Sequence, residues 1–121
     1  MKMTMKQALD AYIAIIAISK AVLPGAIAKK LFDAREELEK QRRFYGEEEE
    51  KLIAKYGGKA DDSGKITFDT TEHAEEYNKK IYEMMNVEAD VNIEYIGTID
   101  AALVNVSVDG IYALKDIITI E

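Results

Sequence analysis

The sequence contains no cysteine, which excludes disulfide bonds, thiolate metal sites and thiol nucleophiles. Its only histidine, His73, has neither a second histidine nor a cysteine with which to form a metal or catalytic centre, and we expect it to be a surface residue. The motifs that mark phosphate-binding loops, dinucleotide sites, serine hydrolases and zinc peptidases are also missing. We therefore expect that the protein is not an enzyme and that it uses no cofactor.

Long apolar runs are missing as well. The nearest is AYIAIIAISKAVL, which is too short for a transmembrane helix because Lys20 and Pro24 interrupt it. The net charge of −7 disfavours direct binding to nucleic acid and to anionic membrane surfaces. No signal peptide is recognisable, and together with the lack of cysteine this favours a cytoplasmic protein.

What is present is the composition of a folded protein. A chain of 121 residues, 48% of them hydrophobic, has room for one core, so residues 1–121 are expected to form a single domain. The periodic segments predict an α+β fold, in which an N-terminal antiparallel helical hairpin with one long helix packs with a small β-α-β unit and a C-terminal helix. The hairpin, the β-α-β unit with its turn, and the C-terminal helical segment correspond to residues 4–56, 57–97 and 98–121.

The longest predicted element is a helix over residues 24–56. Apolar residues recur in it every seven positions, at Leu31, Leu38, Tyr45 and Leu52. A seam with this spacing is typical of a helix that packs against another helix. Gly46 could kink or break the helix, because glycine lowers helix stability by about 1 kcal/mol relative to alanine.

A shorter helix is predicted before it, from about Met5 to Val22. Thr4 and Gln7 have the spacing of a capping box at its start. Proline disfavours helical geometry in the preceding residue, so Pro24 should separate the two helices. The apolar residues of the shorter helix cover more than one face. One face can pack on the long helix, and the other needs the C-terminal half of the chain or a second copy of the protein.

Residues 57–97 begin with a glycine turn and an acidic turn, DDSG. A strand, a helix and a second strand are then predicted at 65–69, 72–86 and 90–96. If the two strands pair in parallel, the crossover between them should be right-handed. The acidic turn aligns with part of a calcium-binding loop, but Lys59 and Thr70 occupy the first and twelfth positions, so no metal is expected there.

Two interpretations of the tail stay open. Val104, Val106 and Val108 alternate as in a strand, whereas Ser107 followed by an acidic residue is typical of a helix start. We favour a final helix over about 108–118.

Two sets of residues are candidate binding surfaces. The first is an apolar set that could contact another protein chain, made up of Tyr12, Ile15, Leu38, Tyr45 and Leu52. The second is the only local concentration of basic residues, which could contact an anionic ligand, and it comprises Lys29, Lys30, Arg35, Arg42 and Arg43. An acidic run follows the basic residues on the same helix, which could make it a polar docking surface.

The middle of the chain resembles a known group of proteins. The stretch KLIAKYGGKADDSG, a short strand and TTEHAEEYNKKIYEMMNVEADVNIEYI are similar to an uncharacterised family of small proteins from phages and prophages of Gram-positive bacteria. The apolar first helix, LPGAIAKKL and the charged helix are similar too, so the likeness covers most of residues 4–96. The resemblance implies a phage context, but it brings no activity and no site residues.

We therefore expect a non-enzymatic phage or prophage accessory protein that acts in the host cell by binding another protein, as an assembly factor or as an inhibitor of a host defence system. The alternative is a protein that binds or sequesters a small ligand such as a nucleotide. The two-sided apolar helix also predicts a homo-oligomer, most simply a homodimer.

Overall fold

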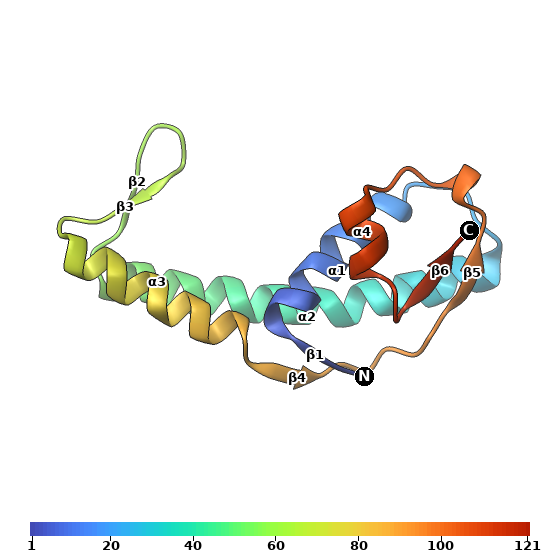
Figure 1. Ribbon diagram of the computed structural model, residues 1–121, viewed down its shortest axis with the longest axis horizontal. Helices are drawn as coiled ribbons and strands as arrows, with labels where there is room; N and C mark the ends of the chain where they lie inside the picture. The colour runs from blue at the N-terminus through green and yellow to red at the C-terminus, as the bar shows by residue number, and fades with distance from the viewer.

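The chain folds into four α-helices, one 3₁₀ helix and six short strands (Figure 1). The computed structural model describes all residues, 1–121, and its mixed helix and strand content confirms the α+β class. The helices are α1 (Met5–Ile18), α2 (Gly25–Lys55), α3 (Thr71–Met85), η1 (Ala101–Leu103) and α4 (Val108–Ala113). The strands are β1 (Lys2–Thr4), β2 (Lys59–Ala60), β3 (Ile66–Thr67), β4 (Glu88–Asp90), β5 (Gly97–Ile99) and β6 (Ile118–Ile120).

The start of α1 is the predicted capping box. The Gln7 amide donates a hydrogen bond to the Thr4 hydroxyl at 3.1 Å, and the Thr4 amide donates one to the Gln7 side chain at 2.8 Å. The helix ends at Ile18, four residues earlier than predicted. The Ile15 carbonyl accepts two hydrogen bonds there, from the Ser19 amide at 2.9 Å and from the Ser19 hydroxyl at 2.6 Å.

α2 is one uninterrupted helix, so no break occurs at Gly46. A Cβ atom at Gly46 would have no other atom within 4 Å, and packing therefore does not require glycine at this position. The helix ends at Lys55 with Tyr56 as its C-cap, within one residue of the predicted end. Gly57 follows with φ +70°, a left-handed conformation that glycine adopts without strain.

The predicted β-α-β unit is wrong, because β3 pairs antiparallel with β2 and not with residues 90–96. The turn between β2 and β3 explains the difference. The Asp61 carboxylate accepts hydrogen bonds from the amides of Ser63 and Lys65, both at 2.9 Å, and closes the turn. A partner so near along the chain costs little loop entropy, so the local hairpin forms.

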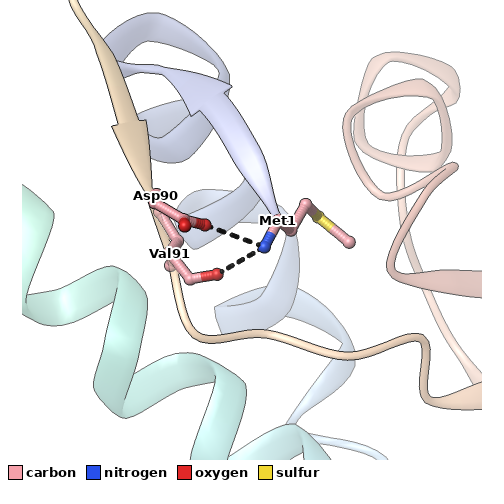
Figure 2. Close-up of polar contacts among 3 residues, drawn as sticks. All are labelled: Met1, Asp90 and Val91. Atoms are coloured by element: carbon pink, nitrogen blue, oxygen red, sulfur yellow. Dashed lines mark hydrogen bonds and ion pairs between the residues drawn. The ribbon is translucent and has the colours of Figure 1, made fainter.

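Two further strand pairs join the two ends of the chain to residues 88–99. β1 pairs antiparallel with β4, and β5 pairs in parallel with β6. Figure 2 shows that the Met1 amino group donates to the Asp90 carboxylate at 3.1 Å and to the Val91 carbonyl at 3.0 Å. These contacts hold the segment that follows β4 against the first strand.

Residues 91–96 have the alternation of a strand without forming one. Their polar side chains face solvent, and their buried side chains are Val91, Ile93 and Ile96. The backbone of the segment bonds to single residues: the Val91 amide donates to the Met1 carbonyl at 2.8 Å, and the Ile96 amide donates to the Ile117 carbonyl at 2.7 Å. The alternation breaks at Tyr95, which is exposed, and the burial of Val91, Ile93 and Ile96 comes from packing on the core and not from a strand ladder.

The C-terminal helix is shorter than predicted. It begins after Ser107, whose hydroxyl accepts a hydrogen bond from the Gly110 amide at 3.0 Å, but it ends at Ala113 and not near residue 118. The chain then turns into β6, where Ile118 is buried and pairs with β5. That partner strand is distant in sequence, and the helical spacing of apolar residues gives no sign of it.

The core lies where α1, the N-terminal half of α2 and the C-terminal third of the chain meet. α1 brings small residues to the core, Ala8, Ala11 and Ala14, which let its neighbours approach closely. Figure 1 shows α3 along the C-terminal part of α2, beyond the N-terminal end of α1, with the β2–β3 hairpin at the far end. We call residues 44–87 the arm and the rest of the chain the body.

Candidate functional site

The predicted interface residues do not form one exposed surface. Ile15 and Leu38 are 0% exposed and belong to the core of a single chain, so they cannot contact a second chain. Tyr12, Tyr45 and Leu52 are half-buried. α4 covers part of the second face of α1, where Ile13 stays exposed, and α3 packs against the distal part of α2. Elements of the same chain therefore cover much of the surface for which a partner was expected.

Aromatic residues hold the arm together. The Tyr45 hydroxyl donates to the Glu49 carboxylate at 2.9 Å, and burial raises the pKa of Tyr45. The Phe68 and Tyr77 rings lie 4.8 Å apart between centroids, and burial also raises the pKa of Tyr77. The distal part of α2 is therefore packed from inside the chain.

The five basic residues of the predicted anion site do not converge. Lys29 and Arg42 form ion pairs with carboxylates of α2 itself, at 2.5 and 2.6 Å. Arg35 lines a cavity of about 200 Å³ beside the α1–α2 linker, whereas Lys30 and Arg43 form no ion pair and line no such cavity. Small-ligand pockets have volumes of about 300–1,000 Å³, so this cavity is small for a nucleotide.

One polar cluster joins α1 to α2. Arg42 donates to the Glu39 carboxylate from Nε at 3.1 Å and from Nη2 at 2.6 Å, and its Cζ atom lies 5.7 Å from the centroid of the Tyr12 ring. The hydrogen bond from Arg42, followed by that from Tyr12, lowers the pKa of Glu39 to about 2. The Glu39 carboxylate in turn raises the pKa of the Tyr12 hydroxyl.

Removing the arginine should restore an ordinary titration of Glu39. In Arg42→Gln we expect the pKa of Glu39 to rise from about 2 toward 4.5, measured by NMR of the side-chain carboxyl carbon. Because the folded-state pKa is the lower one, the interaction stabilises the fold above the unfolded-state pKa, and this stabilisation is lost as the pH falls toward 2. Lys40→Gln breaks a different pair of α2 and should leave the titration of Glu39 unchanged. A pKa of Glu39 that stays low in Arg42→Gln would contradict the assignment.

An open groove of about 760 Å³ lies between α1 and α4. One stripe of α1 lines it, and β1, the loop before α4 and α4 itself complete its walls. Ile13 and Tyr112, which lie on opposite sides of the groove, are each 69% exposed. A Cβ atom on Gly110 would lie 3.5 Å from the Ala14 Cβ, so the two helices approach closely between these walls. We call this feature the α1–α4 groove.

The α1–α4 groove carries both signs of charge in equal number, from Lys2, Lys6, Lys115, Asp10, Asp109 and Asp116. Lys6 Nζ lies 2.8 Å from the Asp10 carboxylate, whose hydrogen bond raises the pKa of Lys6. Lys115 Nζ lies 4.2 Å from the centroid of the Tyr112 ring. The side chains that line the groove therefore have no net charge and do not favour an anionic ligand.

The groove could not be predicted from the sequence because its two walls are far apart along the chain. The only signal was the surplus of apolar residues on the first helix, to which Ile13 belongs. That surplus showed that α1 has more apolar surface than α2 can cover, but it did not show which residues stay exposed.

The arm holds most of the negative charge. Its 44–87 range contains eleven acidic and six basic residues, a net charge of −5 out of −7 for the whole chain. Three large apolar side chains are also exposed on it, with exposed fractions of 51% for Phe44, 72% for Tyr82 and 57% for Val87. The arm is thus an acidic surface with separate apolar side chains among its charges.

No group of three or more side chains that could hold a metal ion occurs in the chain, and no buried polar side-chain atom lacks a hydrogen-bond partner. His73 Nδ1 lies 2.8 Å from the Asp69 carboxylate at the exposed start of α3, and this contact lowers the pKa of Asp69. None of the helices has the length and apolar character needed to span a membrane.

No protein-family model, no curated protein and no solved structure matches the chain. These comparisons therefore assign no function to the chain.

Proposed function

We propose that the chain is a non-enzymatic protein that binds a protein partner through its arm. The observation that carries this proposal is the segregation of charge: residues 44–87 have a net charge of −5, and the rest of the chain has −2. The arm extends beyond the body, so a partner can approach it from several sides (Figure 1). A surface of one sign attracts a partner surface of the opposite sign and speeds the encounter, so the expected partner is basic.

The exposed aromatic residues of the arm support a contact with a protein rather than with a simple cation. Interfaces concentrate their binding energy in a few residues, and tyrosine is among the commonest of these. Tyr82 is 72% exposed on α3, and Phe44 is 51% exposed on α2. A basic protein surface with an apolar pocket could use the acidic residues for encounter and the rings for affinity.

The resemblance to phage and prophage proteins supports an accessory role in the host cytoplasm. Two roles fit a small acidic binding protein: an assembly factor for the virion and an inhibitor of a host defence system. Neighbouring genes distinguish them, because structural and lysis genes would favour assembly and a cluster of small early genes would favour defence inhibition.

Neutralising the arm should weaken partner binding. The triple variant Glu47→Gln, Glu75→Gln and Glu76→Gln removes three exposed carboxylates that form no ion pair within the chain. At about 0.2–1 kcal/mol for each exposed pair, we expect the affinity for the partner to fall on the order of tenfold. The partner would be captured from a lysate of a Gram-positive host on immobilised wild-type protein, and its affinity for each variant would then be measured by calorimetry.

A body variant with the same change of charge is the matched control. Glu36→Gln, Glu88→Gln and Glu94→Gln lie outside the arm and are also exposed. This variant should keep wild-type affinity, and Tyr82→Ala should lose affinity without any change of charge. Equal weakening by the arm and body variants would show that only the total charge matters and would contradict the proposal.

The alternative proposal is a protein that binds or sequesters a nucleotide. The basic residues on α2 support it less well, because two of them are neutralised by carboxylates of the same helix. A ligand that binds only the folded chain raises its melting temperature. A rise with one member of a nucleotide panel that is abolished by Arg35→Gln would favour this alternative over binding through the arm.

A further inference from the structure

We infer that two copies of this chain pair around a twofold axis, each placing the outer face of α4 in the α1–α4 groove of the other. This inference concerns the body of the molecule, and it does not depend on the function proposed for the arm. The residues first expected to form a contact between chains include Ile15 and Leu38, which are buried and cannot reach a second chain. The contact inferred between the two bodies uses exposed residues instead.

The convex half of the contact is the outer face of α4. Val108, Ile111 and Tyr112 are 82%, 41% and 69% exposed, and they share one stripe of the helix at the spacing i, i+3, i+4. A surface helix normally presents polar residues to solvent on such a stripe. α4 presents apolar residues on this stripe instead, and the rest of the chain leaves them exposed.

The concave half of the contact is the α1–α4 groove beside it. Its α1 wall is lined by Ile13, Ala14 and Ala17, of which Ile13 is 69% exposed and Ala14 is buried. A twofold contact requires that one surface patch complement itself, so that residue i meets residue j of the other copy and j meets i. An apolar ridge next to an apolar groove satisfies this requirement, because each copy offers a ridge and receives one.

The charges of the groove favour a second copy as its occupant. Two chains of net charge −7 repel each other at most of their surfaces, and at the arms above all. The groove is the exception, with three lysines and three aspartates around its apolar wall. Twofold pairing can set lysines of one copy opposite aspartates of the other, whereas a strongly basic or strongly acidic partner would meet like charges there.

Light scattering and sedimentation test the inference with the full-length chain. Wild-type protein in the micromolar range should have twice the mass of a 13.6 kDa chain, and Ile13→Glu and Tyr112→Glu should each halve that mass. Both side chains are 69% exposed within one chain, so circular dichroism of the two variants should still show a folded protein. Val22→Glu is the matched control, because Val22 is 94% exposed at the α1–α2 linker, and it should keep the dimer mass.

Cross-linking supplies a second readout that does not depend on stability. The chain has no cysteine, so Ile13→Cys and Tyr112→Cys chains, mixed under oxidising conditions, should form a disulfide between unlike chains, and a Val22→Cys chain should not. The inference would be overturned if the wild-type protein kept the mass of a single 13.6 kDa chain over the whole concentration range, with or without another molecule in the groove. It would also be overturned by a dimer that withstands both glutamate substitutions.

Discussion

Leu38→Ala is expected to lower the free energy of unfolding by about 2–5 kcal/mol, the usual cost of truncating a buried leucine. Leu38 is 0% exposed and belongs to the core cluster where α1 and α2 meet. The substitution removes buried methyl groups and leaves a cavity, and both effects lower stability. Urea unfolding followed by circular dichroism measures the change, at a single protein concentration for all variants because any association would add to stability.

Val22→Ala is the control for this substitution. Val22 is apolar like Leu38 but 94% exposed, so its truncation should change the free energy of unfolding by no more than about 0.5 kcal/mol. If Leu38→Ala costs no more than Val22→Ala, Leu38 is not a core residue. The burial of Leu38 also predicts that Leu38→Glu unfolds a single chain.

Gly58→Ala is expected to lower the free energy of unfolding by about 1–3 kcal/mol, the typical cost of overpacking. A Cβ atom on Gly58 would lie 2.8 Å from Phe68 Cε1, 3.0 Å from Ile66 Cγ2 and 3.1 Å from Ile53 Cγ2. These side chains come from the end of α2, from β3 and from the segment after β3, so the alanine would push the β2–β3 hairpin off the helix. Urea unfolding measures the loss, and amide exchange of the hairpin shows where it occurs.

Gly46→Ala is the matched substitution, with the opposite sign. Gly46 lies inside α2 with open space around its Cα, so alanine gains helix propensity without a clash. We expect an increase of about 0.5–1 kcal/mol in the free energy of unfolding. Equal effects at Gly46 and Gly58 would show that backbone entropy, and not close packing of the hairpin, determines the cost at Gly58.

The helix boundaries that could be predicted are those set by residues near in sequence. Thr4 with Gln7, Thr70 before α3 and Ser107 before α4 each cap a helix through a contact three residues away. The strands could not be predicted in the same way. β1 (residues 2–4) pairs with β4 (residues 88–90), and nothing in the sequence of either strand indicates that the other is its partner.

The candidate site shows the same limit. The apolar spacing of Ile15 and Leu38 correctly indicated side chains that must be covered, but a periodic pattern does not say whether the cover comes from the same chain or from another. The fold supplies the answer, because α4 and residues 91–99 return to α1. The exposed residues Ile13 and Tyr112 could be recognised only after that cover was known.

The continuity of α2 has a mechanical consequence. Its 31 residues form a rod of about 46 Å, of which residues 25–43 belong to the body and residues 44–55 belong to the arm. Since the helix continues through Gly46 without a break and contains no proline, it sets the distance and direction of the arm from the body. A dimer joined through its two bodies would hold its two arms at a fixed separation. Both arms could bind one target at once only where two sites on that target have the same separation, and a second site at any other spacing would add no affinity.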